Sequence, residues 1–217
     1  MNETEYLLAE NNAERLRESI EQLKAGKTER RELIRHLLPQ PMPRFLDIEA
    51  SSLSMDSYPI EVGWSDPEGN IESHLINPYA IEAWTDWDYN AQQVHGLSRE
   101  QCRQEGIHPE WLCQRMSESV PAGEILYADG GGFDESWIDV LFSVSSAFDH
   151  PPFRVVHTDA VMLPLLMKVE PDEKKRWQLY ENLILQARAT VGGRHRAGID
   201  VRYLIELWRL CLNQSQA

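Results

Sequence analysis

The segment RFLDIEA, residues 44–50, places two acids inside an apolar run that is typical of a buried strand. Residues i and i+2 of a strand point to the same face, so Asp47 and Glu49 face the same way. Neighbouring carboxylates repel each other, and each is costly to remove from water alone. A divalent cation between them would relieve both costs, and carboxylate oxygens suit Mg²⁺ or Mn²⁺. This segment therefore predicts both a buried strand and a candidate metal site.

Further strands and helices follow this segment. Residues 60–64 alternate as in a strand, and residues 71–78 return as a third strand after the turn signal DPEG at 66–69. These three strands predict an antiparallel meander, and two short strands follow at 125–128 and 153–156. The predicted helices are 98–119 with a break at 106–109, then 134–144, 171–189 and 201–212. The order predicts an α/β protein with one mixed five-stranded sheet flanked by helices.

The first forty residues differ from the rest of the chain. Apolar residues recur at helical spacing over residues 16–38, with a break near Gly26, and three prolines follow at 39–43. We therefore divide the chain into a helical N-terminal extension, residues 1–40, and a second domain, residues 41–217. Short helices need an apolar face packed against a partner. We expect a homodimer formed through this extension, with packing on the second domain or on another protein as the alternatives.

Composition excludes several classes of protein. The chain has 217 residues, is 42% hydrophobic and carries a formal net charge of −14. Such acidity argues against non-specific coating of duplex DNA, which depends on a basic surface. No segment reaches the roughly 18–20 consecutive apolar residues of a membrane helix, and the acidic N-terminus is unlike a signal peptide. Three cysteines without a CxxC pair are too few for a disulfide framework, so we expect a cytoplasmic protein that does not bind membranes.

A third acid stands at a sharp turn. Asp134 follows the glycine run 130–132 after the strand at 125–128 and opens a helix. The simpler interpretation of such an acid is a helix N-cap. Asp129, which ends the preceding strand, is the alternative acid at this place. We prefer Asp134 because Phe133 precedes it and a helix follows it.

His195 and Asp200 enter the last predicted helix in the sequence HRAGID. Taken separately, a loop histidine is usually a surface residue, and an aspartate near a helix start usually complements the helix dipole. The spacing of His195 and Asp200 indicates a functional site only when it is considered together with Asp47, Glu49 and Asp134.

Taken together, three short motifs resemble the DEDDh branch of the 3′→5′ exonuclease superfamily, which includes proofreading and ribonuclease T-like enzymes. The first is the Asp-x-Glu of Asp47 and Glu49, the second is the Phe-Asp that ends at Asp134, and the third is the His-x-x-x-x-Asp of 195–200. The segment VHGLS, residues 94–98, resembles the His-Gly-Ile/Leu-Ser/Thr segment of that family. The resemblance covers about residues 44–212 and leaves the N-terminal extension outside it.

The resemblance implies a ribonuclease H-like fold and a site for two divalent ions, Mg²⁺ or Mn²⁺. Asp47, Glu49, Asp134 and Asp200 would hold the ions, and His195 would be the general base. An unperturbed histidine, with a pKa of about 6.5, suits that task. Four carboxylates and two divalent ions would cancel in charge, which reconciles an acidic chain with an anionic substrate.

The resemblance also implies contacts to the substrate. Leu53 would pack on the terminal base, and Ser51 keeps a hydroxyl where the family commonly has Thr, although the motif ends ASSL rather than TTGL. His95 would touch the terminal nucleotide, or only hydrogen-bond the backbone. Arg194 and Arg196 beside the predicted base would meet phosphates, or form a solvated basic loop.

Aromatic residues crowd the acidic loop that precedes the His-Gly segment. Trp84, Trp87 and Tyr89 would stack bases if exposed. We favour the alternative, in which they cover the edge of the sheet.

The function favoured by these observations is a metal-dependent 3′→5′ exonuclease, a phosphodiester hydrolase that acts on the 3′ end of single-stranded nucleic acid or on short oligonucleotides. The main alternative is a binding or scaffold protein that keeps the fold and holds a partner with its helical extension. A phosphodiesterase for a small nucleotide would have the same site. Nothing in the sequence selects RNA or DNA.

Overall fold

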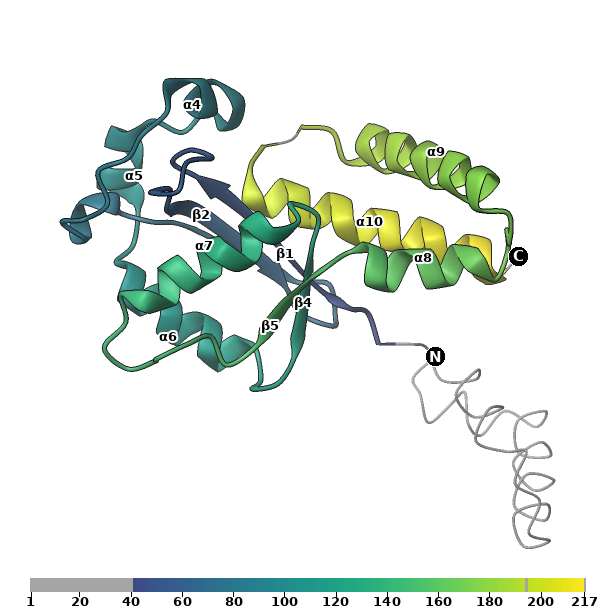
Figure 1. The fold of residues 1–217 in the computed structure, drawn as a ribbon, viewed down its shortest axis with the longest axis horizontal. Coiled ribbons are helices and arrows are strands. Elements are labelled where there is room, and N and C mark those ends of the chain that lie inside the picture. Colours follow the sequence, from purple (N-terminus) through teal and green to yellow (C-terminus); the bar gives the residue numbers. More distant parts are fainter. Residues whose placement is uncertain (1–40, 194, 217) are drawn as a thin grey trace, which may run out of the picture. The chain divides into compact units, whose positions relative to one another are not determined.

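A computed structural model of the protein describes residues 41–193 and 195–216. The predicted N-terminal extension lies outside the described residues. In the described part, five strands form one sheet in the order β3-β2-β1-β4-β5 (Figure 1). The strands are β1 Arg44–Ala50, β2 Pro59–Ser65, β3 Ile71–Leu75, β4 Ile125–Ala128 and β5 Arg154–His157.

The sheet is mixed, as the order of the predicted elements indicates. Strands β1, β2 and β3 pair antiparallel, while β4 pairs parallel with both β1 and β5. The predicted meander and the predicted α/β fold with a mixed five-stranded sheet are both confirmed. Strand β1 lies at the centre of the sheet, which places its two acids in the interior of the fold.

Seven α-helices and one 3₁₀ helix occur in the described residues. They are η1 Pro78–Ala80, α4 Tyr89–His95, α5 Arg99–Glu105, α6 Pro109–Ser119, α7 Gly132–Ser143, α8 Asp159–Met167, α9 Glu173–Val191 and α10 Ala197–Gln216. The predicted last helix begins four residues too late, at Val201, because the small residues Ala197 and Gly198 carry no helical signal. Two helices are not predicted from the sequence: α4, which is short, and α8, which contains Pro164 and is apolar on most of its surface.

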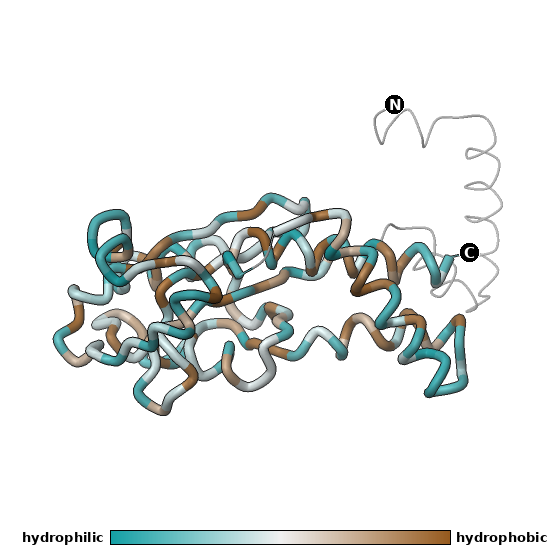
Figure 2. Tube along the Cα trace, turned by 90° about the horizontal axis from the view of Figure 1, so that it is seen from above, coloured by the Kyte–Doolittle hydropathy of each residue, from teal (hydrophilic) through white to brown (hydrophobic). Residues whose placement is uncertain are grey.

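Two hydrophobic cores lie on opposite faces of the sheet. On one face, β1 residues Leu46 and Ile48 pack with residues of α6 and α7. On the other face, Phe45 packs with residues of α8, α9 and α10. Figure 1 shows these two groups of helices on either side of the strands. Hydrophobic and hydrophilic residues follow one another at short intervals along the described chain in Figure 2, as expected where elements have one buried face.

Asp47 and Glu49 share the face of Phe45, on the side covered by α10, because side chains alternate along β1. The start of α10 rests directly on the sheet here. A Cβ atom at Gly63 of β2 would lie 2.8 Å from the carbonyl carbon of Ala197. Only glycine therefore allows this approach, which brings the first turn of α10 next to the acids of β1.

No helix in the described part of the chain is long and apolar enough to cross a membrane.

Candidate active site

Three of the four predicted metal ligands meet in one cluster. Asp47 and Glu49 come from β1, and Asp200 comes from the first turn of α10. One carboxylate oxygen of each lies within 4.8 Å of those of the other two. Residues far apart in the sequence thus form one acidic group on the α10 side of the sheet.

The electrostatics of the cluster favour a bound cation. Loss of hydration and the neighbouring acids, Glu49 first, raise the pKa of Asp47 well above its ordinary value. The pKa of Glu49 is raised to about 8, chiefly by burial and then by the charge of Asp200. A divalent cation would compensate this concentration of negative charge, and the donors are the hard oxygens that Mg²⁺ and Mn²⁺ prefer. The residues present therefore fit such an ion.

Asp134, the fourth predicted ligand, lies beside the cluster rather than in it. It is buried in the first turn of α7, and its Oδ2 accepts a hydrogen bond from the backbone N of Gly130 at 2.9 Å. Its charge nevertheless contributes to the raised pKa values of both Asp47 and Glu49. Burial, followed by the charge of Asp129, raises the pKa of Asp134 itself to about 7. Asp134 is therefore not the helix N-cap of the simpler interpretation, because Gly131 caps α7 and no side chain makes the capping hydrogen bond. Its carboxylate holds the backbone of Gly130 instead and adds negative charge beside the acidic cluster.

Asp129 is a fifth acid in this region. Its pKa is raised, first by loss of hydration, and the charge of Asp200 adds to the shift. Its own charge in turn raises the pKa values of Asp47 and Asp134. The sequence offers Asp129 and Asp134 as alternatives, whereas the structure brings both close to the same group of carboxylates.

His195 is held by its backbone next to Asp200. Its backbone N donates to Oδ2 of Asp200 at 2.6 Å, and the backbone N of Arg196 donates to the same oxygen at 3.3 Å. His195 has a φ of +58°, the left-handed conformation that side-chain-bearing residues seldom adopt. Asp200 therefore shapes the turn that presents His195, and its carboxylate has a structural task besides any metal binding. The role of His195 as general base stays a prediction.

Arg188 is a component of the site that the sequence does not predict. It lies in the last turn of α9, forms an ion pair with Asp200 and stacks 3.4 Å from the ring centre of Tyr203. Its charge also opposes the rise in the pKa of Asp129, which burial causes. An arginine at the end of a helix normally indicates only a favourable dipole interaction, so the sequence carries no signal for this contact.

The residues predicted to contact the substrate differ in their surroundings. Leu53 is 72% exposed on the loop after β1, where a ligand can reach it. Ser51 is fully buried, and its Oγ donates to Asp86 at 3.0 Å, so its hydroxyl stabilises this loop. Arg194 lies outside the described residues. Arg196 forms a two-pronged ion pair with Glu61, a partner that we did not predict, and its contact with phosphate stays a prediction.

His95 is the last residue of α4. It is buried, and its Nδ1 accepts a hydrogen bond from the backbone N of Leu97 at 3.0 Å. This is the backbone contact that we weighed as the alternative to a nucleotide contact. Within the described residues its Nε2 has no hydrogen-bond partner.

The aromatic loop mainly covers the fold. Trp84 is buried and stacks on Tyr58, with ring centroids 5.0 Å apart and planes 2° apart. Trp87 donates to Gln92 at 2.9 Å, whereas Tyr89 is exposed. Trp84 is therefore packed within the core and not available to stack bases, whereas the exposed Tyr89 does not take the covering role that we favour.

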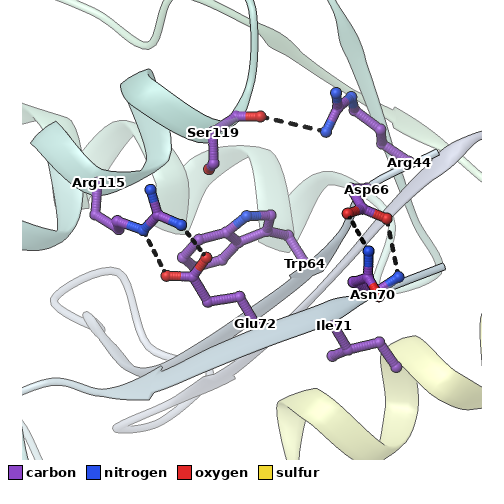
Figure 3. A pocket seen from close by; sticks show the side chains of 8 residues that line it. All are labelled: Arg44, Trp64, Asp66, Asn70, Ile71, Glu72, Arg115 and Ser119. Atoms are coloured by element: carbon purple, nitrogen blue, oxygen red, sulfur yellow. Dashed lines mark hydrogen bonds and ion pairs between the residues drawn. The ribbon is translucent and has the colours of Figure 1, made fainter. Parts of the chain in front are cut away.

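A separate cavity of about 390 Å³ lies on the opposite face of the sheet (Figure 3). Trp64 lines it, and Trp64 pairs in register with Leu46, so both residues face away from Asp47 and Glu49. Most charged side chains that line this cavity are already paired with one another or with a neighbouring amide. Arg115 donates twice to Glu72, at 2.7 Å each, and Asp66 accepts from Asn70. We therefore place the candidate site at the carboxylate cluster and not at this cavity.

Comparisons with known proteins identify solved structures of similar fold but do not assign this chain to a family. No protein-family model matches the sequence, and no curated protein matches it. Among solved structures, the chain is similar to Escherichia coli exonuclease I in complex with a dA16 oligonucleotide, with a TM-score of 0.55 and 12% identity over 81% of this chain and 42% of that one. It is also similar to a moderately thermophilic exonuclease I from Methylocaldum szegediense, with a TM-score of 0.53 and 14% identity over 77% of this chain and 40% of that one. The zinc-bound complex of E. coli exonuclease I with single-stranded DNA has a TM-score of 0.52 and 14% identity over 77% and 39%.

These structural neighbours are nucleases, and at such low identity the likeness establishes the fold alone. The chain spans about two fifths of the length of the exonucleases it matches. It thus combines an α/β fold similar to that of exonuclease I with a cluster of acidic residues on its central strand and last described helix.

Proposed function

We propose that this chain is a metal-dependent 3′→5′ exonuclease of the DEDDh type. The observation that carries the proposal is the meeting of Asp47, Glu49 and Asp200 within 4.8 Å, in a fold shared with exonuclease I. The order of the three sequence motifs supports it independently of the fold.

In this proposal, Asp47, Glu49, Asp134 and Asp200 hold two divalent ions, Mg²⁺ or Mn²⁺. Such ions, when bound, activate the attacking water and stabilise the leaving 3′ oxygen in phosphodiester hydrolysis. His195 accepts the proton of that water, from a backbone position that Asp200 and the start of α10 hold. Leu53, exposed beside β1, packs on the terminal base of the strand.

We propose single-stranded DNA as the first substrate to test, because the exonucleases of similar fold are described in complex with single-stranded DNA oligonucleotides. The formal net charge of −14 supports action at a strand end over extended contact with a duplex. A cytoplasmic location and a homodimer formed through residues 1–40 stay predictions from the sequence.

The test is hydrolysis of a 5′-labelled single-stranded DNA oligonucleotide with Mn²⁺ or Mg²⁺. A ladder that shortens from the 3′ end, and that EDTA stops, is the expected result. An RNA oligonucleotide and a DNA duplex run beside it define the preference. Purified wild-type protein that leaves all three intact with either metal would contradict the proposal and favour the scaffold alternative.

A further inference from the structure

Glu61 holds the segment that leads into α10. It lies in the middle of β2 with only 3% of its surface exposed. Its two oxygens accept from Nε and Nη2 of Arg196, each at 2.9 Å, and its Oε2 also accepts from the backbone N of Ala197 at 3.0 Å. A two-pronged pairing of guanidinium and carboxylate fixes direction as well as distance. Glu61 thus attaches residues 196 and 197 to the sheet.

The segment that Glu61 attaches is the turn between His195 and Asp200. At its other end, Oδ2 of Asp200 accepts from the backbone N atoms of His195 and Arg196. The turn is therefore held from two sides, by a carboxylate of the sheet and by a carboxylate of the helix. A left-handed residue such as His195 persists only where its surroundings fix it in this way.

Close backbone packing supports the same attachment. Gly63, two residues along β2 from Glu61, lies directly against Ala197, and a Cβ at Gly198 would lie 3.0 Å from Oγ of Ser73 in β3. The first turn of α10 therefore lies directly on the backbone of β2 at Gly63 and against the side chain of Ser73 in β3. This close packing and the hydrogen bonds of Glu61 act on the same residues and together determine where the turn lies.

Glu61 also lies beside the metal-site acids. It is the register partner of Glu49 across the antiparallel pair of β1 and β2, so the two side chains are neighbours on one face. The charge of Glu61 raises the pKa of Glu49, and the charge of Arg196 lowers it. By holding Arg196, Glu61 supplies a cation that offsets its own charge next to Glu49.

We propose that Glu61 is a positioning residue of the active site. Through Arg196 and Ala197 it sets the turn 195–200 on the sheet, which keeps Asp200 within reach of Asp47 and Glu49. This inference rests on the proposed function and extends it to a residue that touches neither metal nor substrate.

The test is Glu61→Gln in the full chain. The amide keeps the shape of the side chain but loses the charge-assisted pairing with Arg196. Mn²⁺ affinity, measured by calorimetry, is expected to fall by about 10–100-fold, the usual effect of losing a partner behind a metal ligand. The kcat on single-stranded DNA should fall with it, while KM stays close to that of wild type. Circular dichroism and the melting temperature establish that the variant is folded.

Glu72→Gln is the matched control. Glu72 forms the same kind of two-pronged pair, with Arg115, but on the opposite face of the sheet. Its loss removes an equivalent ion pair without touching the turn 195–200. We expect Mn²⁺ affinity and kcat to match those of wild type.

Arg196→Lys changes the other partner of the pair between Glu61 and Arg196. It also tests the positioning role of Glu61 if Glu61→Gln does not fold. The side chain of Arg196 is 41% exposed, so the lysine ammonium can stay hydrated while the two-pronged geometry is lost. Positioning predicts lower Mn²⁺ affinity and kcat. A rise in KM with unchanged Mn²⁺ affinity would instead assign Arg196 to phosphate binding and overturn the proposal, as would wild-type Mn²⁺ affinity in folded Glu61→Gln.

The outcomes separate this inference from the proposed function. Wild type that binds Mn²⁺ but cuts no oligonucleotide contradicts the function, and the Mn²⁺ affinities still decide the role of Glu61. If wild type binds no Mn²⁺, the rates of backbone amide hydrogen exchange test whether Glu61 positions the turn. The His195 and Ala197 amides should exchange faster in Glu61→Gln, or in Arg196→Lys, than in wild type and Glu72→Gln, and equal rates overturn the proposal.

Discussion

Arg188 in the last turn of α9 forms an ion pair with Asp200 in the first turn of α10. A cation of the protein therefore occupies one oxygen of a predicted metal ligand. The other oxygen accepts from the backbone of the 195–196 turn. Asp200 is thus oriented by the protein itself, and a metal ion would compete with the Arg188 guanidinium for its carboxylate.

This competition predicts the behaviour of Arg188→Gln. Removing the guanidinium frees an oxygen of Asp200, so Mn²⁺ should raise the melting temperature of the variant more than that of wild type. Thermal melts with EDTA and with Mn²⁺ measure the two differences. Arg202→Gln, an exposed change on the same helix as Asp200, is the control and should behave as wild type. An equal or smaller Mn²⁺ effect in Arg188→Gln would contradict the competition.

Asp47→Asn should abolish hydrolysis and raise the melting temperature of the metal-free protein. Burial first, and then the neighbouring acids, raise the pKa of Asp47, so a neutral side chain there avoids both the loss of hydration and the repulsion. Asp200 is not suited to this test, because its carboxylate also shapes the 195–196 turn. Asp139→Asn, an exposed change in α7, is the control. EDTA-treated wild type that still degrades oligonucleotides at full rate would exclude a metal mechanism altogether.

His195→Ala should lower kcat by roughly 10²–10⁴-fold, the scale typical of a positioned acid–base group. Mn²⁺ affinity should change little, because His195 is not a predicted ligand. The measurement is the pH–rate profile, in which the acidic limb of wild type should disappear in the variant. If the pH–rate profiles of wild type and His195→Ala have the same shape, His195 is not the general base.

The metal-free protein should lose stability as the pH rises. The folded-state pKa values of Glu49 and Asp134 are raised, to about 8 and about 7, above ordinary values of 4.5 and 3.8. Their contribution to stability is therefore fully present below the ordinary values and is lost as the pH rises through the folded-state values. Melting temperatures in EDTA from pH 5 to about 9 check this trend. Saturating Mg²⁺ should flatten the curve, and so should Glu49→Gln.

A homodimer formed through the predicted N-terminal helices is tested by light scattering. Full-length protein should have the mass of two chains, whereas protein that begins at Pro41 should have the mass of one and keep its hydrolytic activity. The physical reason is the apolar stripe of residues 16–38, which needs a covering surface. One copy per particle in both samples would rule out self-association.

The central strand was predictable because its signal is local. Two acids at i and i+2 within an apolar run define a strand, a face and a candidate site without any distant contact. Pairing of the strands followed from the turn at 66–69 and from the helices between the later strands. Helix α8 gives no such signal, because Pro164 and an apolar surface on most sides remove the amphipathic pattern.

The contacts of Glu61, Arg188 and Arg196 could not be predicted, because each depends on tertiary packing. Glu61 occupies an alternating position of a strand, where an acid normally indicates a solvated face, yet α10 covers it. Arg196 stands beside a predicted catalytic histidine, where a free arginine would indicate phosphate binding. Its partner is 135 residues away in the sequence, beyond the reach of any local pattern.

The carboxylate cluster joins the first described strand to the last described helix, which couples the site to the completeness of folding. Until α10 has docked on β2, Asp200 is remote from Asp47 and Glu49, whatever the state of the strands. Contacts between distant parts of a chain form late, because closing the long intervening loop costs entropy. A chain still emerging from the ribosome, or one from which a protease has removed α10, therefore carries the β1 acids without the complete carboxylate cluster.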